Sequence, residues 1–473
     1  MSSDHATDIT LAFIPASMLV LTLMLSAIGW QLGYREGSAY LAFWVSITSV
    51  LLAATRLAFS MRPWRGPADG VIRVAIITVA MIVACGLTLG AAGIISRGSY
   101  VIAMLLLFAG SRLLPAPQWP KSLLPQPRLL PIAAGSTAAL LTFAIAYAMT
   151  HAPLTLYDSL SYHLLFPARW LQEGRLSIVP TPFSAPSQAY SPGNGELFFL
   201  WLMAPFHGDF LARVGQLPFC LLCMTTIYAL ARRLGARPVH AFYPAALFLF
   251  GRMILDQAVG ADVDLVCAAT FMTSLYCGIE AIDSRDRQDW ILFGISLGLY
   301  WGSKYLALVY TPVFVFLLLA RGVRKAPLVP LLWAVPGVVV FALPWYLRNW
   351  IVAGSPLYPA SLQVAGLTLA RGAFSRAAMM NSVFHTDDVR LFPVMLAHLF
   401  GPSLFVVWVP LAFIGAIAMV RKPWWPGGWL WLVPFSMMPL YWFGFPVNVD
   451  SRFLMPAVGP ALVPIALLFG RDR

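Results

Sequence analysis

The chain has 473 residues, of which 60% are hydrophobic and 11% are charged, and its formal net charge is +12. Soluble domains carry about 25% charged residues, so this composition excludes an ordinary soluble protein. The basic residues lie in short loops between apolar runs rather than on one amphipathic surface, which argues against a nucleic-acid-binding protein. The five cysteines all lie in apolar segments, and their odd number does not indicate a disulfide framework.

Runs of roughly 20 apolar residues, long enough to cross a hydrocarbon core of about 30 Å, recur along the chain. They predict an all-α polytopic membrane protein with about 14 transmembrane helices. Loops rich in Arg and Lys alternate along the chain as the positive-inside rule requires if the N-terminus is cytoplasmic. This register predicts a four-span module at residues 1–128 and a core at residues 129–473, and it places polar loops 151–194 and 348–390 outside.

The first predicted outer loop carries one carboxylate and one imidazole directly after a span, Asp158 and His163. Asp158 is a candidate general base or metal ligand. The segment after it, from Leu164 to Glu173, has the composition of an amphipathic helix lying in the membrane interface. The alternative interpretation is that Asp158 only caps that helix.

Two aspartates, Asp262 and Asp264, stand at the predicted outer end of an otherwise apolar helix. A carboxylate there is costly unless it has a partner, a cation or a polar cavity. Positions two residues apart on a helix differ by about 200° in direction, so we expect one aspartate to serve a site and the other to face water.

Three cations are predicted on the same outer side: Lys304, Arg348 and Arg452. Arg grips phosphate in a bidentate manner and Lys acts as a point charge, so the three would suit a substrate that carries phosphate. The alternative for each is that its side chain only reaches toward lipid headgroups.

The chain has no HExxH motif, no GxGxxG placed after a strand and no GxxxxGK[ST] motif, so zincin, dinucleotide-binding and P-loop functions have no support. A formal GxSxG occurs at Gly294–Gly298, but it lies inside an apolar helical run. We interpret it as a helix-packing feature rather than a nucleophile elbow.

Several segments, taken in order, resemble the GT-C superfamily of membrane glycosyltransferases, in particular the protein O-mannosyltransferases and the aminoarabinose transferase of lipid A. The resemblance covers about residues 135 to 470. It rests on Asp158 after a span, the turn Tyr190-Ser-Pro-Gly-Asn-Gly-Glu196, Arg213, Gly260-Ala-Asp-Val-Asp264, Gly302-Ser-Lys-Tyr305, Pro344-Trp-Tyr-Leu-Arg348 and Ser451-Arg-Phe453.

The resemblance implies a GT-C-like core with interfacial helices on the outer face and a polyprenyl-phosphate sugar as donor. It implies transfer to a lipid, glycan or protein acceptor, with inversion, at the outer side of a plasma or inner membrane. Asp158 would be the base or acceptor-orienting carboxylate, Asp262 a second acid, and Lys304, Arg348 and Arg452 the donor-phosphate contacts. Weaker substrate-binding candidates are Tyr162, His163, Tyr190, Glu196 and Asp264.

Two features depart from the family pattern: the first loop has one aspartate rather than an adjacent acidic pair, and four spans precede the family's first one. A divalent cation, Mg²⁺ or Mn²⁺, is compatible with the resemblance, but the metal ligands are unknown. The alternative functions are a multi-span transporter or lipid-linked sugar flippase and a non-catalytic assembly subunit. We attribute the main predicted inner-face acids, Glu280, Asp283, Asp286 and Asp289, to loop solvation.

Overall fold

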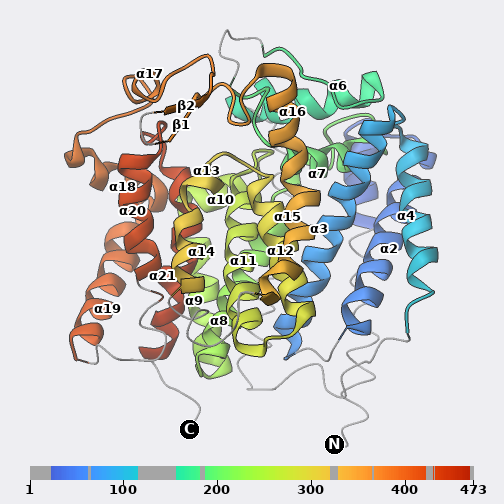
Figure 1. Cartoon of the computed structure of the whole chain (residues 1–473). Coiled ribbons are helices and arrows are strands. Elements are labelled where there is room, and N and C mark those ends of the chain that lie inside the picture. Colours follow the sequence, from blue (N-terminus) through green and yellow to red (C-terminus); the bar gives the residue numbers. More distant parts are fainter. Residues whose placement is uncertain are drawn as a thin grey trace, which may run out of the picture.

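The protein is a bundle of helices of unequal length (Figure 1). The computed structural model describes residues 23–61, 65–115, 156–181, 187–319, 329–364, 367–421, 430 and 432–468. The predicted domain boundary at residue 128 lies outside these residues, and so do parts of the predicted outer loop 151–194. Four described helices are long and apolar enough to cross a membrane, or up to seven if each sharply bent pair counts as one span.

After a helical stretch at 23–31, the described N-terminal part contributes helices that pack together at one side of the bundle (Figure 1). They are α2 (Gly37–Ser60), α3 (Pro67–Ala92) and α4 (Arg97–Ser111). α3 begins with Pro67 in its first turn, where a missing backbone N–H costs nothing, and ends at Gly93 with φ +72°. Because α3 also packs against α7, α8 and α12, it joins this part to the rest of the bundle.

The centre of the bundle is built on α11 (Asp264–Ser284) and α12 (Arg287–Trp301). Every residue of α11 from Asp264 to Ile282 is buried, so this helix is the core of the molecule. The helices around it and before it are α8 (Leu217–Arg233), α9 (Pro238–Leu247), η3 (Phe248–Phe250) and α10 (Arg252–Ala258). Those that follow are α13 (Leu306–Val309), α14 (Thr311–Leu317), η5 (Val329–Ala334), α15 (Val335–Phe341) and α16 (Leu343–Ala353).

The glycines of α12 allow the close packing that the sequence predicts for Gly294 and Gly298. A Cβ added at Gly294 would lie 2.0 Å from the carbonyl oxygen of Ala334, and one at Gly298 would lie 2.3 Å from that of Gly337. The formal GxSxG is therefore a contact surface between α12 and the segment η5–α15, as expected.

One end of the bundle carries short helices and the only strands in the described residues, and we call it the α6 end (top of Figure 1). Its elements are η1 (Ser159–His163), α6 (Leu165–Glu173), α7 (Asn194–Met203), η2 (Ala212–Val214), β1 (Leu362–Val364), β2 (Leu367–Ala370) and α17 (Arg376–Met380). β1 and β2 pair antiparallel, with Val364 opposite Leu367. α7 has ten residues, about 15 Å of helix, which is too short to cross a membrane.

The C-terminal helices complete the bundle and return the chain to the α6 end before the last helix. They are η6 (Val389–Leu391), α18 (Phe392–Phe400), η7 (Leu404–Trp408), α19 (Val409–Arg421), α20 (Leu432–Gly444), η9 (Ser451–Leu454) and α21 (Met455–Leu468).

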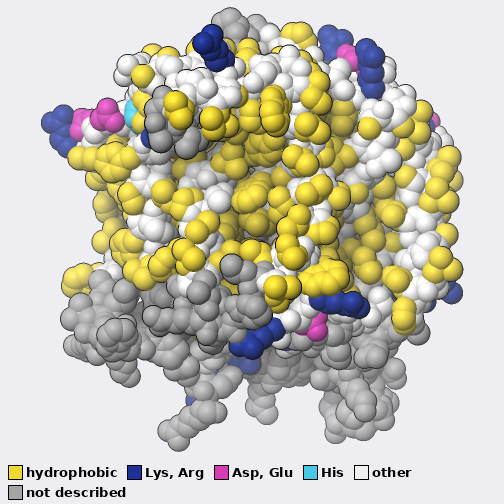
Figure 2. All heavy atoms as spheres, viewed as in Figure 1, with side chains coloured by type: hydrophobic (Ala, Val, Ile, Leu, Met, Phe, Trp, Pro, Cys, Tyr) yellow, Lys and Arg dark blue, Asp and Glu magenta, His cyan; other side chains and the backbone are white. Residues whose placement is uncertain are grey.

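The surface of the bundle separates apolar from charged side chains. Figure 2 shows hydrophobic side chains across the middle of the molecule, with charged side chains gathered toward the two ends of the bundle. This distribution suits a protein that crosses a membrane.

Two of the four acids at the end opposite α6, Glu280 and Asp289, contradict the loop-solvation interpretation, whereas Asp283 is exposed and Asp286 is half-buried. Glu280 and Asp289 are each 2% exposed. Arg65 pairs with Asp289 at 2.6 Å and with Glu280 at 2.7 Å, and Arg73 of α3 pairs with Asp289 at 3.2 Å. Hydropathy places these acids in and beside a short loop, but Arg73 of α3, Arg65 just before α3 and Arg233 of α8 pair with them. We call Arg65, Asp69, Arg73, Arg233, Glu280, Asp283 and Asp289 the α3 cluster.

Candidate active site at the α6 end

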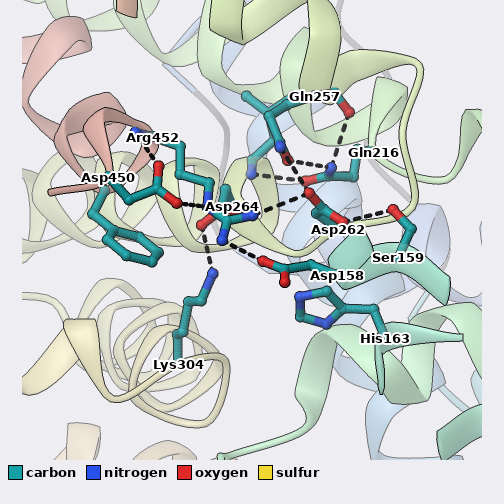
Figure 3. Close-up of polar contacts among 12 residues, drawn as sticks. Asp158, Ser159, His163, Gln216, Gln257, Asp262, Asp264, Lys304, Asp450 and Arg452 are labelled. Atoms are coloured by element: carbon teal, nitrogen blue, oxygen red, sulfur yellow. Dashed lines mark hydrogen bonds and ion pairs between the residues drawn. The ribbon is translucent and has the colours of Figure 1, made fainter. Parts of the chain in front are cut away.

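A second buried ionic cluster lies at the α6 end and centres on Arg452 (Figure 3). Its guanidinium pairs with Asp158, lies 3.3 Å from Asp262 Oδ2 and 3.6 Å from Asp264 Oδ2, and contacts Asp450 Oδ2 at 2.7 Å. One cation thus joins four carboxylates from three distant parts of the sequence. We call Asp158, Asp262, Asp264, Lys304, Asp450 and Arg452 the Arg452 cluster.

The turn between α10 and α11 places both predicted aspartates in the cluster. Asp264 is the first residue of α11, where a carboxylate is favoured by the helix dipole, whereas Asp262 lies before the helix, in the turn. The expectation that one aspartate faces water is wrong, because Asp262 and Asp264 are 1% and 2% exposed. The difference of about 200° in direction holds only between two helical residues, and Asp262 lies outside the helix.

Lys304 joins the cluster from the turn between α12 and α13. Its ammonium lies 2.6 Å from Asp264 Oδ1 and 4.7 Å from the centre of the Phe453 ring. Arg452 lies over the same ring at 5.2 Å. The two cations therefore share an aromatic neighbour and a carboxylate, and Lys304 belongs to the site on the side that the sequence predicts.

Asp158 is the most accessible of the predicted acids that reach Arg452. Its side chain is 18% exposed, against 2% for Asp262 and Asp264. It makes no capping hydrogen bond to the helical segment that follows, so helix capping does not account for it. Burial raises the pKa of Asp158, but the paired Arg452 guanidinium, with His163 and Lys304 nearby, outweighs burial and lowers that pKa below its usual value.

Three polar residues of the cluster's surroundings were not singled out from the sequence. Ser159 donates to Asp262 Oδ1 at 2.6 Å, Gln257 donates to Asp262 Oδ2 at 2.8 Å, and Gln216 donates to Gln257 Oε1 at 2.9 Å. Gln216 and Gln257 are amides at the edges of apolar runs, and an amide in such a place needs a buried partner. The positions of these two amides in the sequence therefore indicate buried hydrogen-bond partners.

Arg348 lies apart from the Arg452 cluster. Its guanidinium donates to Asn349 Oδ1 and to the carbonyls of Ala189 and Ser191, and it stacks on Trp345 at 5.0 Å. Within the described residues it has no carboxylate at ion-pair distance. Of the three predicted cations, Lys304 and Arg452 are thus ion-paired, whereas the contacts of Arg348 are neutral.

The weaker candidates fall into two groups. His163 and Glu196 pair with each other at 2.6 Å next to Asp158, and the Tyr162 ring lies 4.2 Å from that of His163. Tyr190 belongs instead to the neighbourhood of Arg348, because its carbonyl accepts hydrogen bonds from Asn349 and from Tyr305. The structure therefore arranges all of the predicted residues at the α6 end, in two adjoining groups.

The described residues offer no set of three His, Cys, Asp or Glu side chains arranged to hold a metal ion. The carboxylates of the Arg452 cluster are directed at Arg452, Lys304, Ser159 and Gln257 instead. Among the described residues, the acidic side chains of this site are thus arranged around cations of the protein itself rather than as a set of metal ligands.

The fold and the site together define a class: a helical membrane protein with a buried ionic site at one end of its bundle. Residues 197–346 match the family model described as dolichyl-phosphate-mannose-protein mannosyltransferase. The match covers about a third of the chain, and it includes Asp262, Asp264 and Lys304. It confirms the resemblance to the GT-C membrane glycosyltransferases and supports a membrane glycosyltransferase. No curated protein and no solved structure shows significant similarity to the chain.

Proposed function

We propose that the protein transfers a sugar from a polyprenyl-phosphate donor to an acceptor hydroxyl on a lipid, glycan or protein. The observation that carries this proposal is the division of charge at the α6 end. Four carboxylates gather around Arg452, whereas Arg348 lies apart from them and its described partners are all neutral. Such a site can bind an anionic leaving group at one place and an attacking hydroxyl at another.

The donor phosphate would bind at Arg348, whose guanidinium can exchange its neutral acceptors for phosphate oxygens. Lys304 and Arg452 remain proposed contacts to the same phosphate, each already ion-paired with carboxylates. Their positive charge would stabilise the negative charge that develops on the departing polyprenyl phosphate. The four carboxylates around Arg452 would repel the donor phosphate. Arg348, which has no carboxylate partner among the described residues, would therefore be the main phosphate ligand.

Asp158 would orient the acceptor hydroxyl, since it is 18% exposed and lies beside His163, whereas Asp262 and Asp264 are 2% exposed. In the reaction the hydroxyl oxygen attacks the anomeric carbon, the bond from that carbon to the phosphate oxygen breaks, and the hydroxyl proton passes to a base. The attack from the face opposite the phosphate inverts the anomeric carbon. Asp262 would act through its contacts with Arg452 and Ser159, which hold the cluster in place.

The proposal extends to architecture and location. The chain would form a GT-C-like core at 129–473 behind a four-span module at 1–128, with about 14 spans in all. Basic residues such as Arg232, Arg233 and Arg237 lie at the end opposite α6, so the positive-inside rule orients the α6 end outward. The site would then face the periplasmic or extracytoplasmic side of the plasma membrane.

The first test is ligand-induced stabilisation of the purified protein by polyprenyl phosphates and polyprenyl-phosphate sugars. A ligand at about 100 times its dissociation constant stabilises by about 2.7 kcal/mol. We expect this stabilisation in the wild type and its loss in Arg348→Ala. Arg56→Ala is the matched control, because Arg56 also donates to backbone carbonyls, those of Ser111 and Leu114, but lies far along the bundle from the site.

Transfer of sugar from the stabilising donor is the second readout. Asp158→Asn should bind the donor as the wild type does and transfer no sugar. If no polyprenyl phosphate stabilises the wild type, the glycosyltransferase proposal fails and the transporter or flippase becomes the leading function. Full transfer by Asp158→Asn would remove that residue from the reaction.

A further inference from the structure

His163 and Glu196 form a buried pair that the reaction described above does not use. His163 is the last residue of η1, Glu196 lies in the first turn of α7, and the two side chains are 2% and 5% exposed. His163 Nδ1 lies 2.6 Å from Glu196 Oε1. An ionised carboxylate only accepts hydrogen bonds, so Nδ1 is the donor and Nε2 of the neutral ring keeps its lone pair.

Each partner keeps one buried atom without a hydrogen bond among the described residues, His163 Nε2 and Glu196 Oε2. Burying a polar atom without a partner costs about 1–3 kcal/mol, so an orphaned imidazole nitrogen needs an explanation. Figure 3 shows the His163 ring beside the Asp158 carboxylate, at the edge of the Arg452 cluster. The free nitrogen therefore lies within the candidate site rather than in a remote part of the core.

The charged groups around this imidazole come from three elements. Asp158 and Tyr162 lie on its own segment, Glu196 lies on α7, and Asp264 on α11 interacts with it electrostatically. Asp158, in contrast, is held in an ion pair with Arg452, and its lowered pKa makes it a weak proton acceptor. A general base must have an acceptor atom free to take the proton, and an imidazole nitrogen without a hydrogen bond meets this condition better than an ion-paired carboxylate.

We propose that His163 is the general base of the transfer and that Glu196 is its positioning residue. This inference rests on the proposed glycosyltransferase function. His163 Nε2 takes the proton of the acceptor hydroxyl while the oxygen–carbon bond forms, and the bonding electrons of the broken carbon–oxygen bond leave with the polyprenyl phosphate. Glu196 fixes the tautomer and direction of the ring and stabilises the imidazolium, and Asp158 orients the hydroxyl.

The test compares substitutions that preserve different parts of the imidazole. His163→Asn keeps a donor near the position of Nδ1 for Glu196 but removes Nε2. We expect kcat to fall by about 10²- to 10⁴-fold, with the thermal stability and donor-induced stabilisation of the wild type retained. Glu196→Gln should lower kcat less and leave the donor KM unchanged, because it disturbs only the orientation of the base.

His385→Asn is the matched control, since His385 is another buried imidazole at the same end, paired with the exposed Asp387 at 3.3 Å. It should transfer sugar at the wild-type rate. Added imidazole should restore part of the activity of His163→Ala, which a purely structural histidine would not show. This rescue also decides the matter if His163→Asn folds poorly.

Wild-type kcat in His163→Asn, or no imidazole rescue of a folded and inactive His163→Ala, would overturn the role of His163. Absence of transfer by the wild type with every donor would instead overturn the proposed function, and His163 with it. The two failures are thus distinguished by the wild type measured in the same assay.

Discussion

The Arg452 cluster and the α3 cluster lie at opposite ends of the same two helices. α11 begins with Asp264 in the first and carries Glu280 in the second, while α12 carries Asp289 near its start and is followed by Lys304. Three arginines face four carboxylates in the α3 cluster. One arginine and one lysine face four carboxylates in the Arg452 cluster, next to an imidazole with a free nitrogen.

The comparison teaches that buried charge by itself does not mark a functional site. The α3 cluster connects α3 to α8, α11 and α12, so its charges hold the N-terminal helices to the core. The Arg452 cluster joins a loop, a turn and two helix starts, and it adjoins the buried pair His163 and Glu196. We infer that the adjoining imidazole, rather than burial of charge, separates the candidate site from a structural contact.

The largest effect should follow removal of the group that joins the site. Arg452→Met leaves Asp158, Asp262 and Asp264 with Lys304 as their only nearby cation, and breaking a buried ion pair costs about 3–5 kcal/mol. We expect a large drop in unfolding temperature and no sugar transfer. Adding Asp262→Asn should recover part of the stability and none of the transfer. Wild-type stability in Arg452→Met would show that Arg452 does not hold the cluster together.

Arg73→Met probes the other end of the same helices. Asp69 then loses its 2.9 Å ion pair and Asp289 loses one of its two arginines, so we expect a loss of about 3 kcal/mol in the free energy of unfolding. The folded fraction should keep the wild-type kcat and donor KM, because these contacts only connect helices. Arg73→Met combined with Asp69→Leu should recover stability. A changed kcat in the folded protein would contradict the structural assignment of the α3 cluster.

Much of the site could be predicted from the sequence because the apolar runs and basic loops order the spans along one axis. That ordering placed Asp158, Asp262, Lys304 and Arg452 at one end, and the structure brings them into contact. It does not say which side chains from separate spans meet. Arg348 and Trp345 are neighbours on α16, but the carbonyls of Ala189 and Ser191 that accept from Arg348 come from a segment more than 150 positions away.

The α3 cluster shows the other limit of sequence reasoning. Acids in a short loop between helices are usually solvated, and nothing local to Glu280 or Asp289 indicates otherwise. Their burial follows from Arg65 and Arg73, more than 200 positions away in the chain, because α3 packs against this loop. Contacts of such separation are set by tertiary packing, which hydrophobic periodicity does not encode.

The smallest effect concerns the acid side of the stability profile. Burial raises the pKa of Asp158, but the ion pair with Arg452 outweighs burial, so the folded pKa lies below the unfolded value. Stability from this pair is present above pH about 4 and is lost as the pH falls through the folded pKa. Asp158→Asn removes this titration, so its unfolding temperature should fall less steeply than that of the wild type between about pH 5 and pH 3.

The control is Asp450→Asn, for which we expect the opposite dependence of stability on pH. Burial raises the pKa of Asp450, so ionisation of this carboxyl costs stability, and Asp450→Asn should gain stability relative to the wild type as the pH rises. If the acid profile of Asp158→Asn matched that of the wild type, the ion pair between Asp158 and Arg452 would not contribute to stability, and the cluster would be held by Asp262 and Asp264 alone.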